Sequence, residues 1–177
     1  MDISNVLGHH RMKIESLHSL EMGVVWRLVI AFAVLITESE GQTDPCSATV
    51  YSDISDLAKR DPSYGVDSVP LCDRYISPGW YRGGFHKMAT SAPSLAFCGT
   101  LYPFWLNGAH PPVNTISSVE VCKVGFSDTC SQKFNINVKN CSTYIVYELQ
   151  PVDSCNSAYC FEPGTDCEYK LHQVKHV

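Results

Sequence analysis

The order of nine cysteines and one short apolar segment constrains this chain more than any other feature. Every cysteine lies downstream of Leu28–Ile36, which follows Arg27 and leads into the polar stretch Thr37–Gly41. A positive residue, an apolar run of about 7–15 residues and a small polar exit are typical of a secretory signal. Cysteines beyond such a signal meet an oxidising compartment, where disulfides form. The order therefore predicts a secreted, extracellular protein with a disulfide-stapled domain.

We expect residues 1–41 to be a leader that contains this signal and is cleaved after Gly41. Met1–Glu21 would make an unusually long polar start, and a start at Met22 would give the normal layout of a signal. The apolar run is too short to cross a bilayer, which needs about 20 apolar residues. We therefore expect no membrane span in the mature chain.

Residues 42–160 have the length of one domain. The whole chain carries a net charge of −5, and no Lys/Arg cluster marks a surface for nucleic acid. Scattered Gly and Pro with many aromatic residues predict a β-rich, small α+β domain of short antiparallel strands. Residues 161–177 resemble a linker and are expected to be a disordered tail.

One short N-terminal helix is predicted over Ser52–Arg60. Asp53 is a suitable N-cap, and Asp61-Pro62 would end the helix. The Gly, Pro, Ser and Asp content of Ser63–Ser77 then predicts a loop that is anchored by Cys72.

The second half of the domain reads as strands. Lys133–Lys139 alternates between apolar and polar residues, which is the pattern of a half-buried strand. Tyr144–Leu149 is a second run of aromatic and β-branched residues, and the four residues Asn140–Thr143 would close a hairpin between the two. Ser118–Val124 is a third candidate strand, after a tight turn at Asn107-Gly108.

The order of several motifs and cysteines resembles the eight-cysteine domain of the uromodulin family. The resemblance covers Asp44–Cys160. It is carried by Cys72-Asp73, Gly79-Trp80-Tyr81-Arg82, Cys98-Gly99-Thr100, Pro103-Phe104-Trp105-Leu106-Asn107-Gly108-Ala109-His110-Pro111, Cys122, Cys130, Val138-Lys139-Asn140-Cys141, Tyr147-Glu148-Leu149, Cys155 and Ala158-Tyr159-Cys160.

Disulfide connectivity cannot be read from the spacing, because eight cysteines allow 105 pairings. The resemblance implies the pairs Cys46–Cys141, Cys72–Cys155, Cys98–Cys160 and Cys122–Cys130. Some members of the family carry a fifth bridge, and Ala92 and Thr129 stand at its two positions here.

In that family the domain is an extracellular, glycosylated, non-catalytic module, and some members present N-glycans as decoys for bacterial adhesins. Two of the family's glycan positions are absent here, because Asn107-Gly108-Ala109 is not a sequon and Glu148 replaces an asparagine. The sequon Asn140-Cys141-Ser142 remains, in the predicted turn. Asn140 is either a glycosylation site or a turn residue that tolerates left-handed backbone angles.

The residues that could carry chemistry favour a structural role. His86 and His110 lack partners at metal-ligand spacing, and no Cys-x-x-Cys pair starts a zinc site, so no metal or cofactor is expected. A serine-hydrolase turn of the type Gly-x-Ser-x-Gly is absent, and the chain is not expected to be an enzyme. Trp80, Tyr81 and Trp105 either line a ligand surface or, as is more common, pack against disulfides.

Two classes of function remain open, with a small secreted enzyme as a weaker third. The first is a secreted recognition module that binds extracellular proteins, matrix or microbial surface adhesins. The second is a structural spacer in a larger mosaic protein. A high-mannose chain at Asn140 would favour recognition, and a bare monomer without a partner would favour the spacer.

Cys167 is the odd cysteine after four pairs form, and it has three explanations: an intermolecular disulfide, a free reactive thiol, or half of a bridge to a missing neighbour. We expect the third, with Cys167 orphaned in a truncated or alternatively spliced form of a longer mosaic protein. If every mature transcript stops after Val177, truncation is ruled out and the secreted protein should form a covalent dimer. Non-reducing electrophoresis should then show a doubled mass that collapses on reduction. A Cys167→Ser variant that still doubles in mass would contradict this prediction.

Overall fold

The structure is a computed structural model that describes residues 43–164. The predicted leader and most of the predicted tail, with Cys167, lie outside the described residues. One 3-10 helix, η1, spans Asp73–Tyr75. The strands are β1 (Tyr51–Asp53), β2 (Gly79–Arg82), β3 (His86–Met88), β4 (Tyr102–Leu106), β5 (Ile116–Lys123), β6 (Gln132–Asn140), β7 (Ile145–Leu149), β8 (Ser157–Tyr159) and β9 (Phe161–Pro163).

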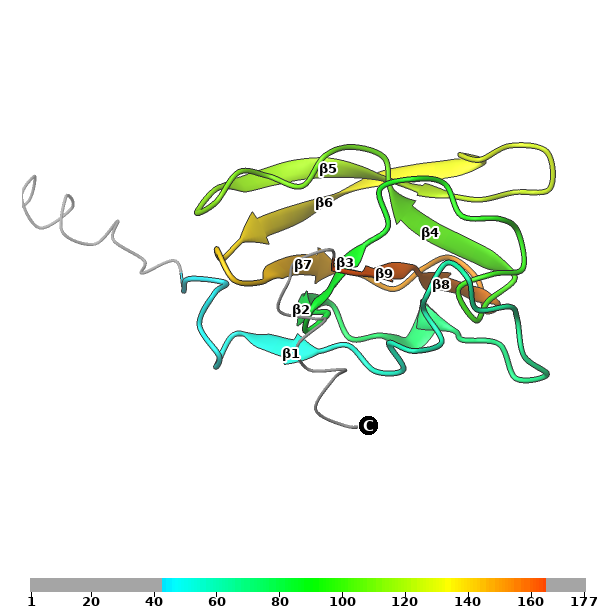
Figure 1. Ribbon diagram of the computed structural model, residues 1–177, viewed down its shortest axis with the longest axis horizontal. Helices are drawn as coiled ribbons and strands as arrows, with labels where there is room; N and C mark the ends of the chain where they lie inside the picture. The colour runs from blue at the N-terminus through cyan, green and yellow to red at the C-terminus, as the bar shows by residue number, and fades with distance from the viewer. Residues whose placement is uncertain (1–42, 165–177) are drawn as a thin grey trace, which may run out of the picture. The chain divides into compact units, whose positions relative to one another are not determined.

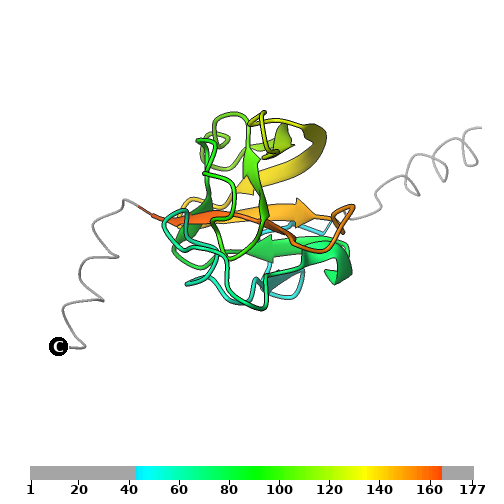
Figure 2. The same ribbon diagram turned by 90° about the vertical axis from the view of Figure 1, so that its right-hand side faces the viewer.

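Seven of these strands form one mixed sheet in the order β1-β2-β7-β6-β5-β4-β8. The five central strands pair antiparallel, as the sequence predicts, whereas the two edge pairs, β1 with β2 and β4 with β8, are parallel. Strands β3 and β9 form a separate two-stranded sheet. Figure 1 shows the long strands β5 and β6 side by side, and Figure 2 shows how strongly β6 curves.

The inner face of the large sheet forms the core. The predicted hairpin is present: β6 and β7 pair antiparallel, and Ile136 and Val138 are buried. Phe134 is partly buried and packs against the same cluster. Two further core side chains, Ile54 and Val152, come from loops, and the others come from strands: Met88, Phe104, Leu106, Val121, Ile145, Tyr147, Leu149, Tyr159 and Phe161.

The small β3–β9 sheet contributes to this core through two side chains. Met88 and Phe161 pair across it and are both fully buried. The rings of Phe161 and Tyr147 pack edge to face, with 5.5 Å between their centroids. The Met88 N–H donates to the Tyr147 hydroxyl at a nitrogen–oxygen distance of 2.9 Å. These contacts join the small sheet to the centre of the large one.

The predicted helix over Ser52–Arg60 is wrong. Its first residues belong to β1, which pairs parallel with β2, and Asp53 binds Arg82 with two hydrogen bonds of 2.7 and 3.0 Å rather than capping a helix. Asp56 then has a φ of 57°, outside the right-handed helical region. Only a turn follows, in which Lys59 and Arg60 donate to the Asp56 carbonyl. Pairing with a strand that lies about thirty residues away overrides the local helical pattern.

Four disulfides join the pairs that the resemblance implied: Cys46–Cys141, Cys72–Cys155, Cys98–Cys160 and Cys122–Cys130. The first three close separations of 95, 83 and 62 residues and tie loop segments to the sheet. The fourth closes the short loop between β5 and β6. A bridge over a long loop contributes about 2–4 kcal/mol, chiefly by restricting the unfolded chain.

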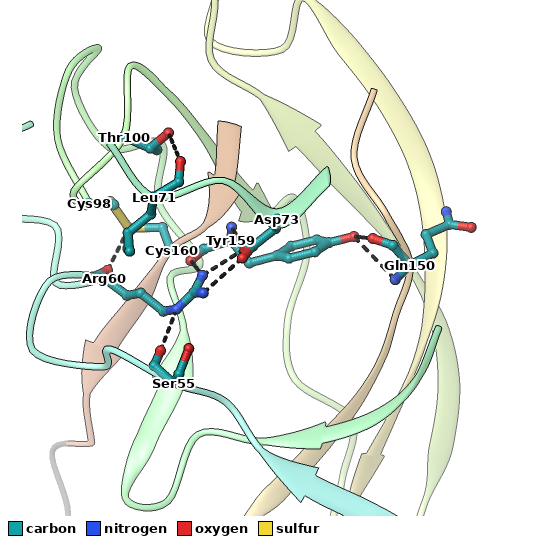
Figure 3. A network of polar contacts seen from close by, with 9 residues as sticks. All are labelled: Ser55, Arg60, Leu71, Asp73, Cys98, Thr100, Gln150, Tyr159 and Cys160. Atoms are coloured by element: carbon teal, nitrogen blue, oxygen red, sulfur yellow. Dashed lines mark hydrogen bonds and ion pairs between the residues drawn. A yellow bond between two sulfur atoms is a disulfide. The ribbon is translucent and has the colours of Figure 1, made fainter. Parts of the chain in front are cut away.

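A buried ion pair between Arg60 and Asp73 lies where the loops, η1 and β8 meet (Figure 3). Both residues are at most 5% exposed, and the guanidinium binds the carboxylate through two bonds of 2.6 and 2.8 Å. Arg60 also donates to the carbonyls of Ser55 and Tyr159. Asp73 accepts from the Tyr159 N–H at 2.8 Å. Both charged groups therefore have several partners, as burial of an ion pair requires.

Replacing Arg60 by Met should destabilise the domain by about 3–5 kcal/mol, because the Asp73 carboxylate is left buried without its cation. The neighbouring pair Lys59–Asp67 is about two-fifths exposed, so Lys59→Met should cost no more than about 1 kcal/mol. Urea unfolding of the secreted protein measures both losses. Equal losses for the two variants would show that the buried pair has no special weight.

Candidate recognition surface

Metal binding and thiol chemistry find no support among residues 43–164. The cysteines there are all joined in disulfides. One group of potential ligands lies close together, Glu120 with Cys122 and Cys130, but the two sulfurs are bonded to each other. Zinc binds cysteine as the thiolate, which this disulfide cannot offer.

His110, which the sequence left without a role, contacts the core. Its Nε2 lies 2.9 Å from the hydroxyl of Tyr147. That hydroxyl also accepts the Met88 N–H, and the tautomer of His110 decides whether the hydroxyl or Nε2 supplies the proton of the bond that they share. Burial, and secondarily the positive charge of Lys87, lower the pKa of His110 to about 4. Burial also raises the pKa of Tyr147, which keeps the hydroxyl protonated. The pair is a neutral structural contact.

Asn140, the sequon asparagine, is the last residue of β6 and not a residue of the free turn. Its Nδ2, the atom to which a glycan would be attached, donates to the carbonyl of Pro111 at 2.9 Å. Its Oδ1 accepts the Ser142 N–H at 3.0 Å, and the intervening Cys141 is bonded to Cys46. The folded domain therefore holds this sequon tightly on both sides.

The three predicted aromatic residues have different environments. Trp105 donates its Nε1–H to the carbonyl of Thr129 and packs against the buried cluster that contains Cys98 and Cys160. Tyr81 packs against the main core. Trp80 is half-buried and pairs across strands with Glu148, so both side chains lie on the outer face of the sheet. Trp105 fits the packing interpretation, and Trp80 is the aromatic residue of the three that lies beside a polar outer surface.

The most distinctive feature of that outer face is a split in the sheet. β6 and β7 pair through only three residue pairs, from Asn140↔Ile145 to Val138↔Tyr147. In the part of β6 before Val138 and the part of β7 after Tyr147, the two strands no longer pair with each other. There β6 remains paired only with β5 on its other side, and β7 only with β2. Figure 1 shows the two strands close together at one end and separating toward the other.

A cleft of about 450 Å³ opens where the strands separate. We call it the sheet cleft; its side chains that matter here are Ser118, Asn135, Asn137, Glu148 and Gln150, with Pro78-Gly79 at one wall. Ile136 and Leu149 also line it, but both are nearly fully buried, so their side chains belong to the core. The accessible lining is consequently polar.

The polar groups of the sheet cleft are only partly committed to one another. Asn137 donates its Nδ2–H to Glu148 at 2.7 Å, a bond that bridges the diverging strands. The side chains of Ser118, Asn135 and Gln150 make no hydrogen bond to the described part of the chain, and all three residues are exposed to solvent. Five polar side chains, four on strands and Gln150 directly after β7, thus line one opening, and three of them make no hydrogen bond within the described residues.

The cations of the outer face are engaged elsewhere. The Arg82 guanidinium packs against the rings of both Tyr51 and Tyr144, with its central carbon 4.9 and 5.3 Å from their centroids, and it is ion-paired with Asp53. Lys133 is paired with Glu120 at 3.1 Å. The sheet cleft itself is lined by no Lys, Arg or His of the described residues, and Glu148 is its one ionisable side chain.

These features define a small β domain that is fastened by disulfides and has a polar outer face, and such disulfide-rich domains are typical of extracellular proteins. The family comparison makes the class specific. Residues 80–161, from β2 to the first residue of β9, match the family model of the uromodulin-like domain with eight cysteines, and the chain contains such a domain. No catalytic family is indicated.

Curated relatives agree with this assignment. The chain is 34% identical over 137 residues to the pancreatic secretory granule membrane major glycoprotein GP2 of Mus musculus, covering 71% of this chain and 25% of the relative. It is 35% identical over 128 residues to uromodulin of Rattus norvegicus, covering 69% of this chain and 19% of the relative. The chain thus spans a quarter or less of the length of these relatives. Within residues 43–164, no helix has the length and apolar character needed to cross a membrane.

The sheet cleft and the Arg60–Asp73 pair were not predicted from the sequence. The alternation along β6 did indicate that Asn135 and Asn137 share the outer face. Nothing in the local sequence indicated that β6 and β7 separate there. The ion pair joins residues from two segments that both read as surface, and their charges gave no sign of burial.

Lowering the pH from 6.5 to about 4 should destabilise the domain through His110. In the unfolded chain its pKa is near 6.5, whereas the folded chain holds it near 4, so the unfolded state binds more protons in this window. His110→Gln keeps an acceptor for Tyr147 and should lose this part of the pH dependence. Urea unfolding at pH values of about 7.5, 5.5 and 4.5 compares the two proteins. A histidine that titrates near 6.5 in the folded state by NMR would refute the prediction.

Glycosylation of Asn140 should be low in the wild-type protein, because closure of Cys46–Cys141 and the bond to Pro111 remove the sequon from reach. A Cys46→Ser variant keeps the sequon but delays or prevents that closure, so its occupancy should rise. Cys72→Ser removes another long-range bridge and serves as the control. Mass spectrometry of the peptide before and after enzymatic deglycosylation measures occupancy. Full occupancy in the wild-type protein is the contrary result.

Proposed function

We propose that the chain is a secreted, non-catalytic recognition module that binds an extracellular macromolecule through the sheet cleft. The observation that carries the proposal is the convergence of uncommitted polar side chains, Ser118, Asn135 and Gln150, on an opening in a rigid sheet. The strands fix the backbone positions of these side chains, so less conformational freedom is lost on binding than in a flexible loop.

The scaffold supports this role. Two long-range disulfides and the Arg60–Asp73 pair fix loops that connect the short strands, and the core beneath the cleft is closed by Ile136 and Leu149. Binding sites are commonly largely preformed and combine concave shape with a few polar groups that set specificity. The sheet cleft is concave and has a few polar groups, and its lining residues come from four different segments of the chain.

A decoy role through a glycan has less support. The single sequon of the sequence is at Asn140, whose Nδ2 is bonded to Pro111. Glu148 stands at a position where the resemblance places a glycosylated asparagine. Its carboxylate instead accepts a hydrogen bond from Asn137 within the sheet cleft. The surface is therefore better suited to bind a ligand than to display a glycan.

Differential capture tests the proposed function. The full secreted chain, a cleft-blocking variant Ser118→Tyr and a control variant Gln132→Ala are immobilised and exposed to native extracellular fluid and to bacterial surface extracts. Gln132 is an exposed amide on the same strand as Asn135, but its position in the alternation places it on the opposite face.

We expect partners that the wild-type and Gln132→Ala proteins retain and that Ser118→Tyr loses, followed by direct titration with each purified partner. Identical capture by all three proteins would favour the spacer function instead. Circular dichroism and thermal unfolding must first show that Ser118→Tyr is folded.

A further inference from the structure

The geometry points to a neutral saccharide chain as the ligand of the sheet cleft. This inference rests on the proposed function and adds the chemical class of the ligand. It follows from the hydrogen-bonding groups, the charge, the apolar content and the size of the opening.

The available side chains match hydroxyl groups. The amides of Asn135 and Gln150 and the hydroxyl of Ser118 each offer both a donor and an acceptor. A sugar hydroxyl also donates and accepts, so each of these groups can bind one in either sense. The fixed Glu148 carboxylate, held by Asn137, adds an acceptor for a further hydroxyl proton.

The charge of the opening selects against anionic sugars. Glu148 is the one ionisable side chain that lines the sheet cleft, and the cations Arg82 and Lys133 of the same face are ion-paired elsewhere. A sulfate, phosphate or sialic acid carboxylate would meet a negative charge without a compensating cation, which costs binding free energy. A neutral chain meets no such penalty.

The lining is poorly suited to an extended peptide. Peptide grooves gain specificity from pockets for alternate side chains. Here the apolar lining residues Ile136 and Leu149 are turned into the core and leave no apolar pocket among the described lining residues. Trp80 instead lies beside Glu148 on the outer face, where a half-buried indole ring can pack against the C–H face of a sugar.

The size fits a short stretch of a chain. The edges 135–137 and 148–150 each present three residues, or about 10 Å at the usual rise of a strand. The volume of about 450 Å³ lies within the range of small-ligand sites. One or two sugar rings can therefore occupy the cleft while the rest of the saccharide extends into solvent.

A glycan array probed with the full secreted protein, followed by calorimetry with the best oligosaccharide, tests this inference. We expect binding to neutral oligosaccharides and weaker or no binding to their sulfated or sialylated forms. Asn135→Ala and Gln150→Ala should each raise the dissociation constant about threefold to tenfold, the range for the loss of one hydrogen bond. Ser118→Tyr should abolish binding, and Gln132→Ala should leave it unchanged.

The outcomes separate this inference from the proposed function. Partner capture that depends on the cleft, without any neutral saccharide bound at millimolar concentration, overturns the saccharide ligand alone. Preference for anionic glycans or for peptides overturns it as well, as does saccharide binding that Ser118→Tyr leaves intact. Capture that does not depend on the cleft overturns both.

Discussion

The buried pair of Arg60 and Asp73 holds together the part of the domain that has the least regular structure. The side chains of the pair bond to Ser55 before the turn and to both the N–H and the carbonyl of Tyr159 in β8 (Figure 3). The Arg60 carbonyl also accepts the N–H of Phe161 in β9. Charges this deeply buried are tolerated only where their polar atoms have partners. The ion pair thus joins η1, the edge strand β8 and the start of β9, in addition to the strand pairing and disulfides of this region.

Disulfides and strand pairing stabilise the rest of the domain. The central strands are held by their ladders, whereas the loops contain few residues that could pair, and three disulfides tie them to the sheet. One loop also needs a close backbone approach: Gly99, next to Cys98, has a φ of 66°, and a Cβ there would lie 2.8 Å from the Lys59 carbonyl oxygen. Glycine is therefore required in the Cys98-Gly99-Thr100 motif.

The same disulfides and strand pairing support the outer face of the sheet, where β6 and β7 separate. A split between two strands would be a weakness in a sheet held by its ladders alone, because strand edges with free polar groups invite unspecific pairing. Here Asn137 and Glu148 bridge the split, and the core below it is closed. The result is a polar opening above a closed core, and this opening is the feature on which the proposed recognition function rests.

The sequence by itself determined the class of the protein and much of the central sheet. Alternation along Lys133–Lys139 predicted β6 and its buried face, since a period of two is a local property of a strand, and the motif order carried the family and the cysteine pairs it implies. Tertiary structure decided the rest. Asp53 is a strand residue because Arg82 of β2 binds it. Arg60 is buried because Asp73 lies beside it and neutralises its charge. The sheet cleft exists because β6 stays paired with β5 and β7 with β2 where the two strands separate from each other. Each of these depends on contacts between residues distant in sequence, and no local pattern records such contacts.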